Sequence, residues 1–263
     1  MLVMDSTEVS QQPTRKRSVL VNVAARVAIT LVAAGSFMLL RQDYWDPIGL
    51  AYRHYVASPG IISAYLKQNP VRKLQIGAGP NNFTGWLNTD YKPIEGQAYL
   101  DATAPFPLPD QSFDYVFSEH VIEHFNYWEG LDMLRESYRV MKPGGRIRVV
   151  TPNLTQLLRL FPAEKPDDAQ KYIQQKLQAV NYWPKTPDDA GLILNLELHD
   201  WGHQFVYSPT LLADSLRKAG FRNIRQYQVG QSDDPKLVNV EGRIKTAEAA
   251  VNQYESLVME AER

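Results

Sequence analysis

Two histidines and one glutamate lie close together in the stretch SEHVIEHF, residues 118–125. His120, Glu123 and His124 follow the spacing H-x-x-E-H, which zinc sites can use. On a helix, the two histidines would lie one turn apart on one face with Glu123 beside them, and that geometry can hold a metal ion. The competing interpretation is that Glu123 and His124 cap and pack the start of a helix without a metal. The neighbouring sequence has to decide between the two.

Glycines and aspartates at the ends of predicted strands form a second set of candidate residues. The first predicted strand, KLQI, runs directly into Gly77 and Gly79. Glycine tolerates positive φ and has no side chain, so the backbone can approach a bound nucleoside closely here. Asp90 ends the next predicted strand, where a carboxylate can accept hydrogen bonds from both ribose hydroxyls. Asp101 follows a short extended stretch and could accept from an adenine amino group. Each aspartate alone is also an ordinary turn or cap residue.

Alternating strands and helices are expected to position these residues. Extended patterns predict strands at residues 73–76, 86–90, 113–118 and 146–151. Between the last two strands, a three-four apolar spacing predicts a helix that the sequence KPGG stops. The residues of that apolar spacing are Leu131, Leu134, Tyr138 and Met141. Alternation with short turns predicts a parallel sheet covered by helices on both faces.

The C-terminal part continues this pattern with a change. Ser208 and Pro209 are a good N-cap and first-turn pair for a helix through Lys218. Strands are predicted at residues 223–229 and 236–240, and the polar turn between them indicates an antiparallel hairpin. A final helix is predicted from an apolar stripe. The residues of that stripe are Ala247, Val251, Tyr254, Val258 and Ala261.

Composition describes an ordinary globular protein. The chain has 263 residues, of which 44% are hydrophobic and 22% charged. The formal net charge of −1 gives no electrostatic reason to expect nucleic acid as a partner. The chain contains no cysteine, which excludes disulfides, thiolate zinc sites and thiol nucleophiles.

The N-terminal region differs from the rest. Residues 1–18 are polar, include the basic cluster RKR and are expected to be a tail. Residues 19–40 are mostly apolar and about long enough to cross a bilayer as a helix. Residues 41–70 are predicted to be an irregular or short-helical connector. Residues 71–263 would then form the main domain, in which residues 161–198 carry no motif and are expected to be a lid-like insertion.

Three interpretations of residues 19–40 remain open. A spanning helix would have its N-terminus in the cytoplasm, because the basic cluster precedes it. A signal peptide is the second interpretation, although the apolar run FMLL makes a poor cleavage boundary. The third is a helix that packs on the domain or lies in a membrane interface, which a narrow polar stripe favours. The residues of that stripe are Ser18, Asn22, Arg26 and Thr30.

The pieces between residues 72 and 229 resemble the class I S-adenosylmethionine-dependent methyltransferases. The likeness is closest to the methyltransferase type 11 group and its relatives in bacterial glycan-related gene sets. It is carried by LQIGAGP, LNTDY, LDATAPFPLPDQSFDYVFSEHVIEH and LRESYRVMKPGGRIRVVTPNL, in that order and spacing. The resemblance implies an α/β Rossmann-like methyltransferase fold. Its sheet would be mostly parallel and seven-stranded, with an antiparallel C-terminal hairpin and an additional N-terminal apolar helix.

The resemblance also implies the cofactor, S-adenosylmethionine, and the residues that bind it. These residues are Gly77, Ala78, Gly79, Asp90, Asp101, Ala102, Ser118 and Glu119. Of these, Asp90 would hold the ribose, and Asp101 with Ala102 would contact adenine. His120 would lie beside the sulfonium and the acceptor pocket, and it is the first candidate for catalysis. In the family, a segment like HVIEH needs no metal, so no metal site is expected.

Two further observations qualify the resemblance. Only ten residues separate Gly79 from Asp90, too few for a full crossover helix with turns, so the first helix should be shortened or replaced by a loop. In the relatives, a histidine-rich stretch before a YSP helix overhangs the acceptor. By that likeness, His199 or His203 could act as general base on a hydroxyl acceptor. The alternative is that the His199-Asp200 pair only orders its loop.

The expected function is therefore S-adenosylmethionine-dependent methyl transfer to a small-molecule, glycan or lipid-linked acceptor at oxygen. One alternative is a methyltransferase-fold module that binds cofactor without turnover. A more remote one is a zinc hydrolase that uses His120, Glu123 and His124. Because the cofactor is a cytosolic metabolite, we expect a cytoplasmic enzyme at the inner face of the membrane, with contact through residues 19–40. A single-pass membrane protein is the alternative.

Overall fold

The fold is that of a computed structural model, which describes residues 47–179, 189–242 and 249–263. The expectations for the tail (1–18) and the apolar helix (19–40) lie outside these residues. Residues 51–263 form one compact unit, distinct from residues 1–50. The strands are β1 (Lys73–Ile76), β2 (Leu87–Asp90), β3 (Ala98–Tyr99), β4 (Phe113–Glu119), β5 (Met141–Pro152), β6 (Arg222–Tyr227) and β7 (Ser256–Glu262). The helical elements are α2 (Pro47–Tyr52), a π-helical turn η1 (Arg53–Ala57), α3 (Ser58–Gln68), a 3₁₀ turn η2 (Ile122–His124), α4 (Tyr127–Val140), α5 (Leu154–Leu158), α6 (Asp167–Ala179), α7 (Asp189–His199), α8 (Pro209–Ala219) and α9 (Ala249–Glu255).

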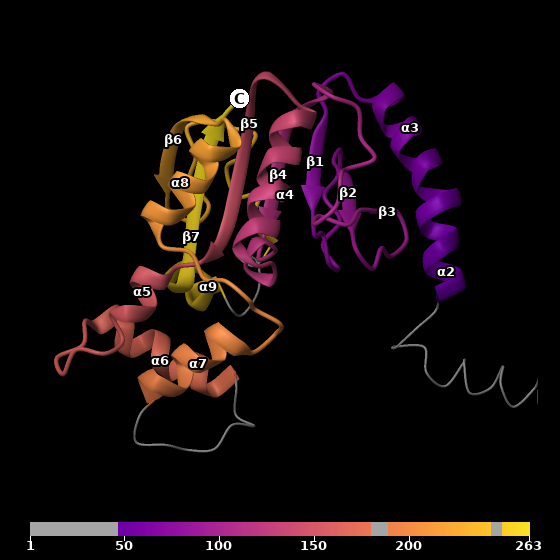
Figure 1. The fold of residues 1–263 in the computed structure, drawn as a ribbon. Helices are drawn as coiled ribbons and strands as arrows, with labels where there is room; N and C mark the ends of the chain where they lie inside the picture. The colour runs from indigo at the N-terminus through magenta and orange to yellow at the C-terminus, as the bar shows by residue number, and fades with distance from the viewer. Residues whose placement is uncertain (1–46, 180–188, 243–248) are drawn as a thin grey trace, which may run out of the picture. The chain divides into compact units, whose positions relative to one another are not determined.

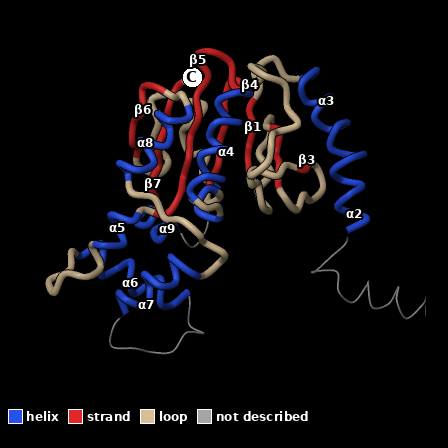
Figure 2. Tube along the Cα trace, in the orientation of Figure 1, coloured by secondary structure: helices blue, strands red, loops and turns tan. Residues whose placement is uncertain are grey.

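The strands form one seven-stranded sheet in the order β3-β2-β1-β4-β5-β7-β6 (Figures 1 and 2). β1 pairs in parallel with both β2 and β4, and β4 pairs in parallel with β5. β7 is antiparallel to both β5 and β6. The strand order reverses between β1 and β4, and ligands of open parallel sheets bind at the carboxyl ends of strands at such a point. The predicted fold, a mostly parallel sheet with an antiparallel C-terminal pair, is confirmed.

The two faces of the sheet are covered differently. On one face, Leu74, Ile76 and Val116 pack with residues of α4 and α8 in the main hydrophobic core. On the other face, Phe117 and Val150 pack against loop residues. Those loop residues are Phe83, Trp86, Leu237 and Val240. This second face is therefore covered at this point by loop side chains rather than by a helix.

The helix predicted after the third strand is α4, and its start is well specified. Asn126 accepts hydrogen bonds from the backbone nitrogens of Trp128 and Glu129, while the Glu129 side chain accepts from the Asn126 nitrogen. This reciprocal capping box satisfies donors at the helix N-terminus. Glu123 and His124 do not cap this helix, because they lie in η2, before the cap. That part of the expectation is wrong.

The C-terminal elements differ from the prediction in two respects. Residues 236–240 are not a strand: the Asp234 side chain accepts from the Lys236 nitrogen and the Asp234 carbonyl from the Leu237 nitrogen, which curls this segment into turns. The antiparallel partner of β6 is instead β7.

The final helix is also shorter than predicted. It ends at Glu255, and Val258 and Ala261 of the predicted stripe lie in β7. β7 is an internal strand between β5 and β6, and Leu257, Val258 and Met259 are all buried in succession. A strand buried on both faces carries a continuous apolar run, and that run also fits a helical spacing.

Helices occupy two further parts of the fold. α3, within the predicted connector, contributes Ile62 and Tyr65 to the main core. Residues of α5, α6, α7 and α9 share a smaller core, in which Leu157, Tyr172 and Ile193 are buried. These helices lie beyond the carboxyl ends of the parallel strands (Figure 1). None of the helices in the described ranges combines the length and apolar character needed to cross a membrane.

Arg139 of α4 holds the loop that leads into β4. Its guanidinium bonds to both oxygens of Glu136, to Asp110 and to the carbonyl oxygens of Phe106 and Leu108. Because hydrogen bonds to charged groups contribute more than neutral ones, we expect Arg139→Met to lower the free energy of unfolding by roughly 2 kcal/mol.

Urea unfolding monitored by circular dichroism would measure this loss. The matched control is Arg135→Met on the same helix, because among the described residues Arg135 makes only an exposed pair with Asp132. The control should change stability by less than about 0.5 kcal/mol. Equal effects of the two substitutions would show that Arg139 does not anchor the loop.

Candidate active site

The two glycines of the turn after β1 have different surroundings. Gly77 and Gly79 both have positive φ, +67° and +52°. A Cβ on Gly77 would lie 2.3 Å from Cγ2 of Val121, so the backbone needs glycine to pack against this residue. A Cβ on Gly79 would meet no heavy atom of the described residues within 4 Å. Gly79 therefore borders open space at the carboxyl end of β1.

These two glycines should respond differently to substitution. We expect Gly77→Ala to destabilise the fold strongly, because the methyl group collides with Val121 in addition to the backbone strain. Gly79→Ala should fold, with a cost of about 1 kcal/mol for the positive φ, but its methyl group would project into the space proposed for the cofactor. Thermal unfolding and calorimetric titration with S-adenosylhomocysteine would separate the two effects. Unimpaired binding by Gly79→Ala would show that the cofactor does not lie against this turn.

Two buried amide side chains shape the loop between β1 and β2. Gln97 donates from Nε2 to the Gly79 carbonyl (2.7 Å) and to Asn82 Oδ1 (2.8 Å). Asn88 binds the backbone nitrogen and carbonyl of Phe83. No helix forms between Gly77 and Trp86, so the predicted replacement of the first helix by a loop is confirmed. No sequence pattern pointed to Gln97, which lies in an ordinary stretch before β3.

Asp90 and Asp101 end neighbouring segments beside the glycine turn. Asp90 accepts from the Gly79 nitrogen (2.9 Å) and from the Lys92 nitrogen (2.7 Å). Asp101 accepts from the backbone nitrogen and the hydroxyl of Thr103, at 2.9 and 2.7 Å. A carboxylate offers about four acceptor positions, so both keep capacity for a ligand. Asp90 therefore contacts the turn directly, and Leu100, the residue before Asp101, donates from its backbone nitrogen to the Asp90 carbonyl (3.0 Å).

The other predicted cofactor residues lie near the same edge. Ala78 and Ala102 are buried. Ser118 is also buried, and its hydroxyl has no hydrogen-bond partner among the described residues. Glu119 accepts from the Gly242 nitrogen (2.8 Å), which places the segment before residue 243 over the end of β4. That segment is anchored by a buried ion pair between Glu241 and Arg148.

His120 follows directly after β4 and has an unusual conformation. Its φ is +52°, a value uncommon for residues other than glycine, and its backbone nitrogen donates to the Val150 carbonyl (2.9 Å). Strained residues of this kind concentrate at functional sites. The ring Nδ1 lies 2.9 Å from Glu123 Oε1. A carboxylate only accepts, so Nδ1 carries the hydrogen.

Glu123 is fully buried beneath His120. Its second oxygen accepts from the hydroxyl of Thr151 (2.9 Å). Burial raises the pKa of Glu123, but the hydrogen bond and charge of His120 outweigh it and hold the pKa below its usual range. Glu123 is therefore an ionised carboxylate that fixes the ring of His120. Sequence analysis assigned Glu123 only to packing or to a metal and missed this role.

The other predicted histidines occupy different surroundings. His203 packs its ring against His124, with centroids 5.0 Å apart. His199 is exposed at the end of α7. The remote alternative, a metal trio of His120, Glu123 and His124 on one helix face, does not have that geometry, because His120 lies between β4 and η2 and its ring binds Glu123 directly. The side chains that converge are instead Glu123, His124 and His203.

α9 connects His120 to a cluster of buried charges. Asn252 Oδ1 lies 3.4 Å from His120 Nε2, while Asn252 Nδ2 is buried without a hydrogen-bond partner among the described residues. Three residues further on, Glu255 binds Lys176 (2.8 Å) and the hydroxyl of Tyr172 (2.9 Å) of α6. Burial lowers the pKa of Lys176, but the charges of Glu255 and Glu197 raise it by more than burial lowers it. The pKa of Lys176 therefore lies above its usual value, and its side chain is charged. These contacts fix α6 and α9 against each other.

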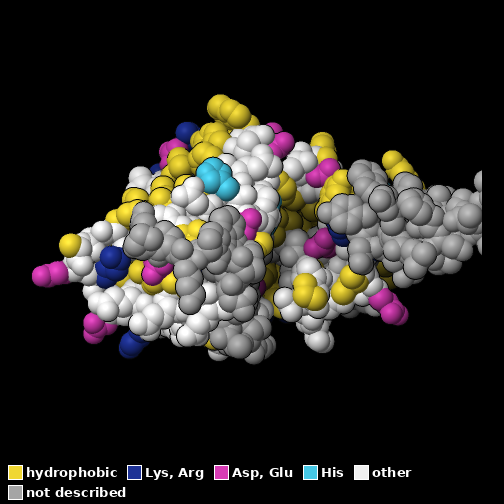
Figure 3. Space-filling model, turned by 90° about the horizontal axis from the view of Figure 1, so that it is seen from below, with side chains coloured by type: hydrophobic (Ala, Val, Ile, Leu, Met, Phe, Trp, Pro, Cys, Tyr) yellow, Lys and Arg dark blue, Asp and Glu magenta, His cyan; other side chains and the backbone are white. Residues whose placement is uncertain are grey.

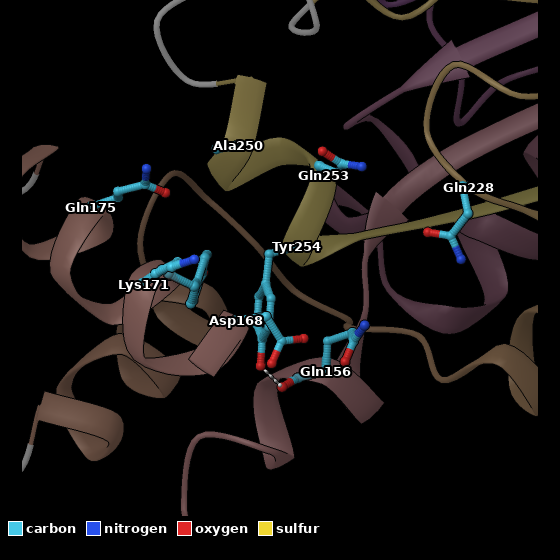
Figure 4. A pocket seen from close by; sticks show the side chains of 9 residues that line it. Gln156, Asp168, Lys171, Gln175, Gln228, Ala250, Gln253 and Tyr254 are labelled. Carbon is cyan, nitrogen blue, oxygen red and sulfur yellow. Dashed lines mark hydrogen bonds between the residues drawn. The ribbon is translucent and has the colours of Figure 1, made fainter. Parts of the chain in front are cut away.

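A pocket of about 330 Å³ lies beside α9 (Figure 4). Four of its nine lining residues are glutamines, and the others are two tyrosines, two charged residues and one alanine. The lining residues are Gln156, Asp168, Lys171, Tyr172, Gln175, Gln228, Ala250, Gln253 and Tyr254. Tyr254 lies at the centre of the view, and its hydroxyl donates to the Gln156 carbonyl. Seen from below, the described surface shows a histidine among uncharged and apolar side chains (Figure 3).

The arrangement fits an adenosine-containing cofactor. Gly79 borders open space, Asp90 and Asp101 offer acceptor positions next to it, and the Ser118 hydroxyl is buried without a described partner. These groups lie at carboxyl ends of strands on both sides of the point where the strand order reverses.

Comparisons with known proteins agree with this geometry. Residues 74–149 match the family model of the methyltransferase domain. A probable S-adenosylmethionine-dependent methyltransferase from Mycolicibacterium smegmatis is 46% identical over 50 residues, a stretch that spans 19% of this chain and 19% of that relative.

Two solved structures are similar over longer stretches. An S-adenosylmethionine-dependent methyltransferase from Archaeoglobus fulgidus is 18% identical, with 79% of this chain and 92% of that chain covered and a TM-score of 0.46. One from Mesorhizobium loti is 15% identical, with 78% and 96% covered and a TM-score of 0.44. The match over residues 74–149 confirms the resemblance seen in the sequence: this segment is similar to the methyltransferase domain and to an S-adenosylmethionine-dependent methyltransferase.

Proposed function

We propose that the protein transfers a methyl group from S-adenosylmethionine to a hydroxyl oxygen of a glycan or lipid-linked acceptor. The observation that carries the proposal is the His120–Glu123 pair at the end of β4. Val121, the next residue after His120, contacts the glycine turn, so the pair lies next to the proposed cofactor site. A hydroxyl is a poor nucleophile until its proton is removed, and this pair supplies an oriented acceptor for that proton.

The residues near the glycine turn would bind the cofactor. Gly77 and Gly79 would give the cofactor access to the backbone, Asp90 would bind its ribose and Asp101 its adenine. When bound, S-adenosylmethionine supplies an activated methyl group on a positively charged sulfur. The protein's main contribution is alignment of the two reactants.

His120 would take the hydroxyl proton on Nε2, while Glu123 holds the ring through Nδ1 and stabilises the resulting imidazolium. Asn252 Nδ2, buried near the ring, would donate to an acceptor oxygen. His203 is the alternative base among the sequence candidates, because its ring also lies near Glu123.

The acceptor class is inferred from the pocket beside α9. Asn252 of this helix contacts His120, while the adjacent Gln253 and Tyr254 line the pocket, so one end of an acceptor could lie near His120 and the rest in the pocket. Four glutamine side chains offer paired donors and acceptors without charge, which suits the hydroxyl groups of a sugar. Small molecules without such groups would leave these amides unused.

Transfer of a labelled methyl group tests the proposal. The full chain would be incubated with methyl-labelled S-adenosylmethionine and, separately, with extracted glycans, extracted lipid-linked sugars and small hydroxylated compounds. We expect label in a sugar-containing fraction, in a base-stable ether linkage. Label only in small compounds would overturn the acceptor class. Cofactor binding without transfer to any fraction would favour the alternative of a non-catalytic binding module.

The proposal includes where in the cell the enzyme acts. Residues 19–40, behind the basic cluster RKR, would hold the enzyme at the cytoplasmic face of the membrane, where its cofactor is available. Flotation of the full chain with vesicles that contain anionic lipids, compared with a version that starts at residue 42, would test this attachment. Equal flotation of the two would contradict it.

A further inference from the structure

We propose that Glu123, His124 and His203 form a binding site for one zinc-type divalent cation. The three side chains offer one carboxylate oxygen and two ring nitrogens, which all lie within 4.8 Å of one another. They come from two segments far apart in sequence, η2 and the stretch after α7. This site is a property of the fold that does not depend on the acceptor or on methyl transfer.

The two imidazoles are oriented as metal-binding rings are. Nδ1 of His203 lies 2.7 Å from the carbonyl oxygen of Glu197, and since a carbonyl only accepts, Nδ1 carries the hydrogen. Nε2 of this ring therefore keeps its lone pair. Nδ1 of His124 lies close to the backbone of Gly202: a Cβ on that glycine would be 3.8 Å from it. Histidines that bind metals almost always donate their other ring nitrogen to a carbonyl or carboxylate, which fixes the tautomer.

Glu123 is positioned for the third bond. His120 and Thr151 each donate to one of its oxygens, at 2.9 Å, and each oxygen still has a lone pair. Carboxylates that bind metals are themselves held by such hydrogen bonds. His120 would then hydrogen-bond to the ligand Glu123, rather than bind the ion itself as the H-x-x-E-H spacing suggests.

The two segments are already joined without help from an ion. The backbone nitrogens of Gln204 and Phe205 both donate to the Glu123 carbonyl, at 2.8 and 3.1 Å. The side chain of Gln204 donates to the His124 carbonyl (2.7 Å). The ligands are therefore preorganised, and a cation here would fix Glu123 and the segment after α7 behind His120.

The donor set selects the class of ion. Magnesium and calcium prefer sites made of oxygen ligands only, whereas imidazole suits zinc and its neighbours among the transition metals. Two histidines and one glutamate with a fourth position left for water are a common zinc arrangement. The chain has no cysteine and only five histidines, so few other ligands of this kind compete.

The test is a zinc titration of the full chain, purified without a histidine tag and first stripped with a chelator. We expect one equivalent of zinc per chain by calorimetry, and a visible absorption band of tetrahedral cobalt when Co²⁺ is added instead. His203→Ala should weaken zinc binding by more than about 100-fold. Loss of a residue that only hydrogen-bonds to a ligand costs about 10- to 100-fold, so a larger loss marks His203 as a ligand. His199→Ala is the matched control, because this nearby histidine is exposed and is not one of the three ligands.

The outcomes are distinct. Loss of binding in His203→Ala and in His124→Ala, with retention in His199→Ala and native circular dichroism in all three, would support the site. No stoichiometric binding by the wild-type chain, or equal binding by wild type and His203→Ala, would overturn it. Neither result bears on methyl transfer, since S-adenosylmethionine binding is measured separately on the same samples.

Discussion

His120→Gln is expected to lower kcat for methyl transfer by about 10²- to 10⁴-fold, the usual contribution of a positioned general base. Glutamine retains a polar group of similar reach but cannot take the acceptor's proton. Because His120 is assigned no contact with the ribose or the adenine, the affinity for S-adenosylhomocysteine should stay close to that of the wild type. Initial rates with labelled S-adenosylmethionine and calorimetry on the same preparation would measure both quantities.

The same substitution at the other candidate histidines separates the competing assignments. His199 is exposed at the end of α7 and should tolerate glutamine with little loss of rate. A large loss in His199→Gln with a normal rate in His120→Gln would move the proton acceptor to the C-terminal end of α7. A normal rate in both would leave His203 as the proton acceptor, and a normal rate in His203→Gln as well would indicate an acceptor that needs no base, such as an amine.

Asp90→Ala is expected to weaken binding of S-adenosylmethionine by about 100-fold or more. Two hydrogen bonds to a charged acceptor would be lost, each worth about 1.5 to 3 kcal/mol. The substitution also removes the anchors from Asp90 to the Gly79 and Lys92 nitrogens, so the glycine turn loses its support at the same time. Calorimetric titration would measure the change in Kd.

Asp132→Ala is the matched control for this substitution. Asp132 is exposed on α4 and pairs only with exposed Arg135. The control should bind the cofactor as the wild type does. If Asp90→Ala also retains wild-type affinity while circular dichroism shows a native fold, then Asp90 does not hold the ribose, and the cofactor must lie elsewhere.

The sequence predicted the parallel part of the sheet because its strands are short, apolar and bounded by clear turns. Gly77, Gly79 and Asp90 could be placed from their positions at strand ends alone, since parallel strands share one carboxyl edge. The loop in place of the first helix also followed from simple length, because ten residues cannot hold a crossover helix.

The C-terminal strands could not be predicted in the same way. Val258 and Ala261 fit the stripe of a helix, but the sheet offers an internal position between β5 and β6 that favours a strand. Which of the two wins is decided by tertiary packing rather than by local pattern.

The arrangement around His120 was only partly foreseeable. His120 itself was a candidate, but its pairing with Glu123 depends on a positive φ at His120 and a 3₁₀ turn rather than a helix. Asn252 lies 132 residues away in sequence, and no pattern links it to His120. Gln97 likewise acts on Gly79 only because β3 pairs with β2.

The central claim is that S-adenosylmethionine binds at the glycine turn beside Asp90, and calorimetric titration of the full chain tests it most directly. We expect saturable binding of one molecule of S-adenosylmethionine, and of S-adenosylhomocysteine, per chain, with both lost in Gly79→Ala. Absence of binding of either compound by the folded wild-type chain would contradict the account.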